Sequence, residues 1–209
     1  NYDEAIEHLP RQYDGYRFTP EKGFTPMFNP FSVLNALAKS RFGDYWFASG
    51  TPTFLVEILK KTNFDLRELD GIEVSSASLS DDRANISNPV PMIYQSGYLT
   101  IKSFDQRFRT YTLGFPNEEV KYGFLNFVAP FYTPVASTDT TFYIGKFVHE
   151  LETGETEAFL TRLSCFFADF PYELNEKTER HYQVVFYLVF KLMGQFTQAE
   201  VRTAIGRAD

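Results

Sequence analysis

Two short stretches with the alternation of β-strands, separated by a polar turn, constrain the fold of this 209-residue chain more than any other feature. In residues 98–102, Leu99 and Ile101 alternate with more polar neighbours, which is the period of a strand that is exposed on one side. Residues 109–113 repeat the pattern after a turn around Asp105 and Gln106. The pair predicts a β-hairpin over about residues 97–114.

Helix signals dominate the rest of the chain. Asn29 is suited to cap a helix and Pro30 to occupy its first position, and Phe31, Leu34 and Leu37 follow at helical spacing. The pair Thr51-Pro52 predicts a second helix start in the same way, with Thr51 as the cap and Pro52 at the first helical position. Between the two helix starts, the consecutive aromatic residues Tyr45-Trp46-Phe47 predict a packed aromatic segment, which we call the aromatic plug.

Later helices are expected from Asn117, from near Thr140, over about 154–170 and over about 177–193. The last of these is expected to turn Phe186 and Phe190 inward, and Cys165 is expected in the core. Residues 199–203 predict a further strand. The chain is therefore an α+β protein, predominantly helical, in which the helix before the hairpin gives the outline of a winged-helix module.

Three sections follow from this pattern. Residues 1–62 form a helical section, 63–120 form the winged-helix-like section with the hairpin, and the chain is helical from residue 121 on and ends in a strand.

Composition limits the classes of function. Apolar residues make up 44% of the chain and aromatic residues 18%, so it has ample material for a core. A net charge of -7 argues against a protein that mainly coats nucleic acid, because such binding depends on Lys and Arg displacing counterions from phosphates. The single cysteine excludes an internal disulfide, so a cytoplasmic location is expected. No apolar run reaches the roughly 18 to 20 residues of a membrane span.

Six blocks resemble, in order, the bacterial AAA-ATPase-like family that carries a C-terminal PD-(D/E)XK nuclease domain. The blocks are Tyr13-Asp14-Gly15-Tyr16-Arg17-Phe18, Asn29-Pro30-Phe31-Ser32, Tyr45-Trp46, Gly50-Thr51-Pro52, residues 95–101 and Pro116-Asn117-Glu118-Glu119-Val120. The resemblance covers nearly the whole chain. It implies that residues 1–62 are the end of the ATPase region, that 121–172 are a second helical region and that 173–209 are the truncated start of the nuclease. A fragment is therefore expected, which begins without Met and ends inside a catalytic motif, Gly206-Arg207-Ala208-Asp209.

By this resemblance, Asp209 is a catalytic residue and a metal ligand, Glu179 supplies another acidic group, and Glu200 is a further candidate. Phosphodiester cleavage needs a hard cation such as Mg²⁺, which polarises the phosphate, activates water and prefers carboxylate oxygens. The Glu-x-Lys element that would complete the site is absent. From sequence alone, Glu179 and Glu200 also fit ordinary surface charges. The family match favours a catalytic role for Glu179 and Asp209 and leaves Glu200 open.

Other candidate residues have competing structural explanations. Asp14 and Arg17 are candidates for nucleotide sensing in the intact ATPase, although Asp-Gly is first a turn signal. Lys102, Arg107 and Arg109 are candidates for contact with a nucleic-acid backbone, although exposed charges on a hairpin are more often there for solubility. No Gly-x-x-x-x-Gly-Lys-Ser/Thr loop is present, so we expect this chain alone to hold neither ATP nor Mg²⁺.

Two hypotheses of different classes remain open. In the first, the chain is part of an ATP-driven nuclease that acts on DNA or RNA, with the missing ATPase core and the remainder of the nuclease as its partners. In the second, it is a non-catalytic module that binds protein or DNA. Neither hypothesis involves a membrane, and the sequence leaves the oligomeric state open.

Overall fold

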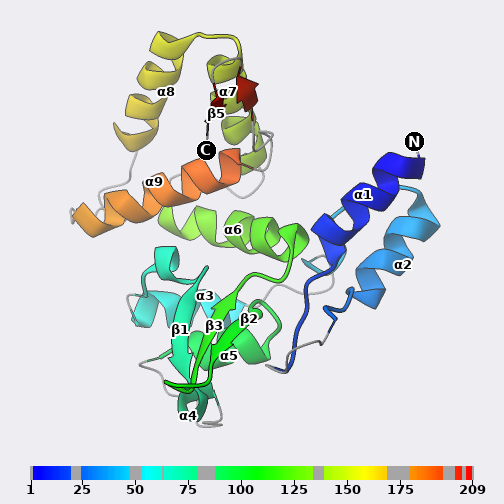
Figure 1. Cartoon of the computed structure of the whole chain (residues 1–209). Coiled ribbons are helices and arrows are strands. Elements are labelled where there is room, and N and C mark those ends of the chain that lie inside the picture. The colour runs from blue at the N-terminus through cyan, green and yellow to red at the C-terminus, as the bar shows by residue number, and fades with distance from the viewer. Residues whose placement is uncertain are drawn as a thin grey trace. The chain divides into compact units, whose positions relative to one another are not determined.

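The computed structural model describes residues 2–19, 25–47, 53–62, 64–79, 88–133, 139–168, 179–194, 201–203 and 206–208. The chain divides into two compact units, Asn1–Phe124 and Leu125–Asp209. It is a mixed α+β protein and mostly helical, as the sequence predicts, and it has a small three-stranded antiparallel sheet (Figure 1). No described helix is both long and apolar enough to cross a membrane.

Unit 1 begins with three helices, α1 (Tyr2–Tyr13), α2 (Pro30–Lys39) and α3 (Thr53–Lys61). The predicted cap of α2 is confirmed, because the Asn29 side chain accepts hydrogen bonds from the amides of Phe31 and Ser32 at 3.1 and 3.3 Å. The helix ends at Ser40, which adopts a left-handed conformation. The helix expected after Thr51-Pro52 is present from Thr53, while its predicted cap lies outside the described residues.

The sheet of unit 1 has the strand order β1-β3-β2 and is antiparallel throughout. The predicted hairpin is confirmed as β2 (Thr100–Asp105) and β3 (Thr110–Gly114), which lie side by side in Figure 1. The strand β1 (Ile72–Ser75) was not predicted, and it pairs with β3 so that Leu113 lies opposite both Ile72 and Ile101. A register shift falls between Ile101 and Ser103, at Lys102. Two short helices, α4 (Ser76–Leu79) and α5 (Val90–Gln95), connect β1 to β2.

The aromatic plug lies in the core of unit 1. Trp46 contacts Tyr98 with ring centroids 5.0 Å apart, and Phe47 packs so closely on Gly123 that a Cβ there would lie 2.3 Å from the Phe47 ring. Tyr98 in turn contacts Phe124. The plug therefore joins the segment after α2 to the hairpin and to the start of α6 (Glu118–Tyr132).

The apolar face of α2 does not face the core. Phe31, Leu34 and Leu37 are 49%, 67% and 63% exposed, although apolar residues at this spacing normally mark the buried face of a helix. The buried side carries Ser32 and Ala36 instead. Small side chains let α2 lie close to its neighbours, which leaves the larger apolar residues outside.

Unit 2 contains α7 (Thr140–Glu152), α8 (Thr156–Ala168), α9 (Glu179–Met193) and the two-stranded pair β4 (Val201–Thr203) and β5 (Gly206–Ala208), and the boundary between the units falls within α6. The three predicted helices and the strand within 199–203 are confirmed. The Phe147 ring packs edge-on against Phe159 and Phe166, and it forms the contact between α7 and α8. Arg162 of α8 donates to the buried Glu150 of α7 at 2.6 Å.

Three of the expected inward side chains of unit 2 lie outside. Phe186 and Phe190 are exposed and stack on each other, because Val185 and Val189 occupy the buried side of α9. Cys165 is also exposed, which corrects its assignment to the core. The buried side of α8 carries Phe159, Leu163 and Phe166, so the errors concern single side chains rather than the whole faces of α8 and α9.

Candidate functional site

The predicted nuclease residues are only partly within the described structure. Glu179 is the first residue of α9, is exposed, and accepts a hydrogen bond from Gln183 at 3.0 Å. Glu200 and Asp209 lie outside the described residues, next to β4 and β5. Within the described ranges, no three His, Cys, Asp or Glu side chains gather in a group that suits a metal ion.

The sequence blocks that carry the family resemblance meet within unit 1 around one buried carboxylate. Glu119, in the first turn of α6, is fully buried. Its Oε1 accepts a hydrogen bond from the Ser32 hydroxyl at 2.9 Å and another from the Trp46 amide at 2.9 Å. Glu119 thereby joins three of the six blocks. A fourth block, Gly50-Thr51-Pro52, lies outside the described residues.

The environment of Glu119 opposes its negative charge. Burial raises the pKa of this carboxyl, the hydrogen bonds from Trp46 and Ser32 act in the opposite direction, and the negative charge of Asp44 raises it further. Its Oε2 is buried and has no hydrogen-bond partner among the described residues. The sequence singled out Glu119 only as a member of the block Pro116-Asn117-Glu118-Glu119-Val120, and its burial was missed.

The first block also packs against the others through its backbone. Asp14 accepts a hydrogen bond from the amide of Gly15 at 2.7 Å, and Gly15, with a φ of 109°, lies directly against the carbonyl oxygen of Pro116. Arg17 donates its amide to the Thr100 hydroxyl at 2.7 Å. Asp14 and Arg17 therefore lie in a segment that connects α1 to β2 and to the start of α6.

The three hairpin cations occupy two different places. Arg107 and Arg109 are exposed at the tip, on either side of Phe108, which is 65% exposed. The Arg107 guanidinium lies 4.9 Å from the centre of the Phe108 ring. Lys102 lies near the base of the hairpin, where its ammonium is 3.5 Å from the Pro116 carbonyl oxygen. The sequence did not single out Phe108, although an aromatic residue between two arginines in a polar turn was visible.

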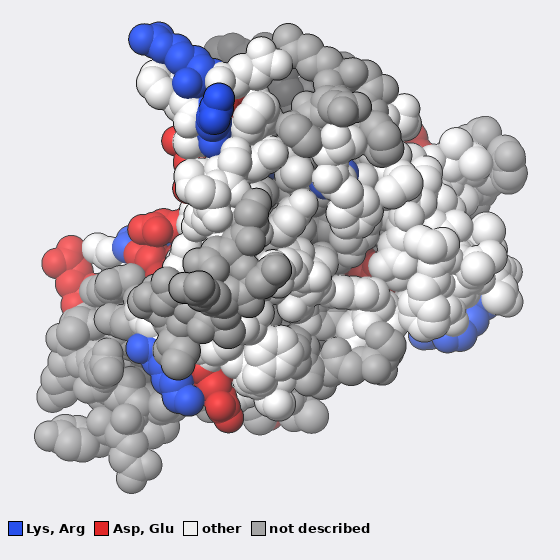
Figure 2. Space-filling model, turned by 90° about the horizontal axis from the view of Figure 1, so that it is seen from below, with Lys and Arg blue, Asp and Glu red and all other residues white. Residues whose placement is uncertain are grey.

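The hairpin tip is held in a fixed conformation. The Asp105 carboxylate accepts hydrogen bonds from the amides of Arg107 and Phe108 at 2.7 and 3.0 Å. Arg109 has a left-handed φ of 53°, and its carbonyl accepts hydrogen bonds from both the amide and the hydroxyl of Ser76 at 3.1 and 3.0 Å. On the face seen in Figure 2, basic side chains form small groups among uncharged and acidic residues rather than a continuous basic stripe.

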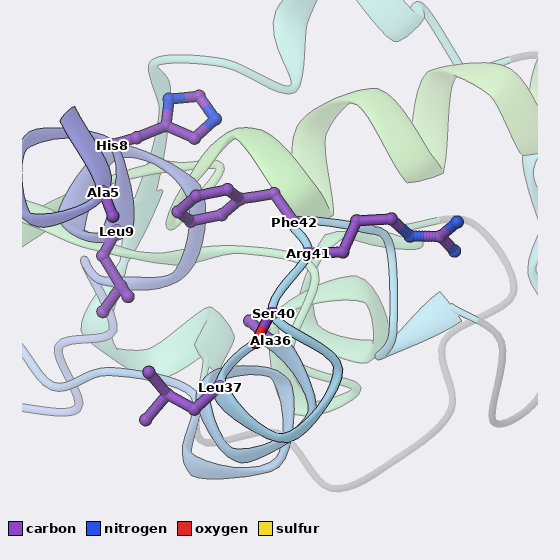
Figure 3. Close-up of a pocket in the computed structure, with 8 residues that line it drawn as sticks. All are labelled: Ala5, His8, Leu9, Ala36, Leu37, Ser40, Arg41 and Phe42. Atoms are coloured by element: carbon purple, nitrogen blue, oxygen red, sulfur yellow. The ribbon is translucent and has the colours of Figure 1, made fainter. Parts of the chain in front are cut away.

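A pocket of about 520 Å³ lies between α1 and α2. Its lining is mainly apolar, with His8 packed edge-on against Phe42 at 4.5 Å and with Leu9 and Leu37 on opposite sides (Figure 3). The side chain of Arg41 extends away from this centre. Such a lining suits apolar side chains better than phosphates or metal ions.

No known family model matches the chain, and no solved structure matches it. The chain is similar to an uncharacterized protein in the vnfD 5' region of Azotobacter chroococcum mcd 1, with 30% identity over 205 residues. The match covers 94% of this chain and 39% of the relative. The chain therefore spans about two-fifths of the length of the relative it matches.

Proposed function

We propose that this chain is the middle portion of a longer nucleic-acid-processing protein, which combines an ATPase with a metal-dependent nuclease, and that the chain itself is not catalytic. The observation that carries the proposal is the order of α-helices and strands over residues 53–114: α3, β1, α4, α5, β2 and β3, with strand order β1-β3-β2. This order agrees with that of a winged-helix module, a fold that many nucleic-acid-binding proteins share. Fold alone does not establish function, which depends on the residues that the fold presents.

The residues favour the hairpin over the helix as the nucleic-acid contact. The helix α5, which would be the recognition helix of a winged-helix module, has the sequence VPMIYQ and contains no Lys or Arg. The hairpin tip instead presents Arg107 and Arg109 around an exposed Phe108. Arginines bind phosphates and an aromatic ring stacks on an unpaired base, so this tip is suited to a single strand or to the opened end of a duplex.

A binding assay tests the role of the hairpin. We expect a gel shift with a single-stranded oligonucleotide at low salt, and its loss when Arg107→Gln and Arg109→Gln are combined. The matched control combines Lys61→Gln with Lys146→Gln, which removes the same charge from exposed positions elsewhere. Equal weakening by the two double variants would show that only net charge matters, and no shift at micromolar protein would reject nucleic-acid binding by the hairpin.

The nuclease part of the proposal rests on the second unit and on the resemblance. The helix α9 starts at Glu179 and precedes the antiparallel pair β4–β5, and Asp209 directly follows β5. This order agrees with the opening of a PD-(D/E)XK domain. Glu200 and Asp209 lie outside the described residues, so the site for Mg²⁺ stays a prediction from the resemblance. Because that resemblance requires a Glu-x-Lys element to complete the site, and because this sequence has no P-loop, we assign metal-dependent cleavage, like ATP hydrolysis, to the longer protein.

Cleavage by that longer protein tests the assignment. We expect magnesium-dependent cleavage of DNA or RNA that is lost in Asp209→Ala and reduced in Glu179→Gln. The matched control is Glu157→Gln, an exposed acidic residue in the first turn of α8. Full activity in Asp209→Ala would overturn the nuclease site.

A second candidate function, a module that binds protein, is favoured by the exposed apolar face of α2. Phe31, Leu34 and Leu37 cover consecutive turns of one helix, and such continuous apolar exposure commonly marks a protein contact. If this face packs against another part of the longer protein, Leu34→Glu will lower the melting temperature of that protein and leave this chain unaffected. Equal melting temperatures for the wild-type and variant longer proteins would reject the candidate.

A further inference from the structure

Three basic residues from distant parts of unit 1 come together in the fold, near the acidic residue Asp70. Arg17 follows α1, Lys102 lies in β2 and Lys121 lies in the first turn of α6. The Lys121 ammonium is 4.0 Å from Asp70 Oδ2. Arg17, Lys121 and Asp70 all act electrostatically on Lys102. The sequence placed Arg17 and Lys102 in two separate roles and did not single out Lys121.

The fold builds this cluster with backbone contacts as well as with charges. The carbonyl oxygen of Arg17 accepts a hydrogen bond from the amide of Ile101 at 3.3 Å, which places Arg17 beside the residue preceding Lys102. Both Asp70 and Lys102 lie over Gly114. A Cβ at Gly114 would come within 2.9 Å of Asp70 Oδ1 and 3.2 Å of Lys102 Cε. A glycine at this position therefore leaves the space in which the two side chains meet.

The cluster has an excess of positive charge. It contains three cations and one carboxylate, and the Lys102 side chain and Asp70 both lie over Gly114. Partial burial lowers the pKa of Lys102 first, the negative charge of Asp70 opposes this effect, and the positive charges of Arg17 and Lys121 lower the pKa further. An anion bound between the three basic groups would relieve this repulsion. A local positive site of this kind stands out in a chain whose net charge is -7.

We propose that Arg17, Lys102 and Lys121 form a binding site for a phosphate group. A guanidinium offers a planar pair of donors and each ammonium offers a mobile point charge, and phosphate oxygens accept both. The phosphate belongs either to a nucleotide or to a nucleic-acid backbone, which share this chemistry. The site lies apart from the arginines of the hairpin tip, and it stands or falls independently of the function proposed above.

Calorimetric titration of the whole chain at low ionic strength tests the proposal. The probes are inorganic pyrophosphate, ATP and oligothymidylate, and the variants are Lys102→Gln, Lys121→Gln and Asp70→Asn. We expect each lysine variant to weaken binding by about tenfold, since a hydrogen bond to a charged group is worth that much. Asp70→Asn should tighten binding, because it removes the competing carboxylate. The control, Lys61→Gln, removes one exposed positive charge in the same unit.

The results separate the two sources of phosphate and also decide the proposal. Preference for pyrophosphate and ATP over oligothymidylate identifies a nucleotide site, and the reverse identifies a backbone site. A gain in affinity by Asp70→Asn cannot come from misfolding. This variant therefore still tests the proposal if a lysine variant fails to bind because it is misfolded. The proposal is overturned if the wild type binds none of the three probes, if Lys61→Gln weakens binding as much as Lys121→Gln, or if Asp70→Asn weakens it.

Discussion

The buried carboxylate of Glu119 allows a sharp test of how unit 1 is held together, through the pair Glu119→Ala and Glu119→Gln. The alanine variant leaves the Ser32 hydroxyl and the Trp46 amide without the acceptor they use. The glutamine variant keeps an oxygen at the same place and removes the charge. The two variants therefore separate the hydrogen bonds from the burial of a carboxylate.

The magnitudes follow from these contacts. A buried donor left without an acceptor costs about 1–3 kcal/mol, and the Ser32 hydroxyl can rotate to limit its loss, so we expect Glu119→Ala to lower the free energy of unfolding by about 2–4 kcal/mol. Glu119→Gln should change it by less than about 1 kcal/mol near neutral pH, since the lost charge was itself unfavourably buried. The neighbouring Glu118→Gln is the control, because its ion-pair partner Arg11 is 56% exposed and such a pair is worth less than about 1 kcal/mol.

The pH dependence of the free energy of unfolding provides a second, independent test of the buried Glu119 carboxyl. The pKa of Glu119 is raised above its ordinary value of 4.5, so the folded state binds this proton more tightly than the unfolded state. Its stabilising contribution is fully present below pH 4.5 and is lost as the pH rises through the folded-state pKa. The stability of the wild type relative to Glu119→Gln should therefore fall as the pH is raised across that interval.

Urea denaturation followed by tryptophan fluorescence measures both effects. Trp46 is the single tryptophan of the chain and donates its amide to Glu119, so its emission reports on unit 1. Equal losses of stability in Glu119→Ala and Glu119→Gln would refute the role given to the two hydrogen bonds. A rise in the relative stability of the wild type with pH would refute the role given to burial.

Two further predictions concern packing in each unit. Gly15→Ala should destabilise unit 1 by about 3 kcal/mol or more, because its Cβ would lie 2.1 Å from the Pro116 carbonyl oxygen. Gly71→Ala should cost about 1 kcal/mol, because Gly71 has a similar positive φ but open space around it. Urea denaturation of both variants measures the two costs, and equal costs would contradict the prediction. Arg162→Leu should destabilise unit 2 by about 2 kcal/mol, because it leaves the Glu150 carboxylate buried without its cation. Thermal unfolding followed by circular dichroism measures this, and an unchanged melting temperature of unit 2 would show that the ion pair contributes nothing to stability.

Local signals predicted the elements of this fold well where one residue sets a boundary. Asn29 and Pro30 located the start of α2, and the alternation around Leu99 and Ile101 located the hairpin. The strand β1 was not predicted, because its four residues, Ile72–Ser75, are too few to establish the alternation of a strand. It is stabilised by pairing with β3, which is a tertiary contact that no local pattern encodes.

Which side of a helix is buried was harder to predict than where the helix lies. The spacing of Phe31, Leu34 and Leu37 is that of a core face, yet Ser32 and Ala36 are the buried residues of α2. Helix propensity and periodicity describe one element at a time, while burial depends on the shape of its neighbours. The same limit applies to the site, since the meeting of Arg17, Lys102 and Lys121 depends on how three separated segments fold together.

The rigid hairpin tip has a consequence for the thermodynamics of any complex it forms. Asp105 and Ser76 already fix the backbone on both sides of Phe108, so little conformational entropy remains to be lost when a partner binds. Replacing Asp105 by Ala would restore that freedom without removing a contact group. Affinity would then fall through a less favourable binding entropy, while the enthalpy of the Phe108 and arginine contacts stayed the same.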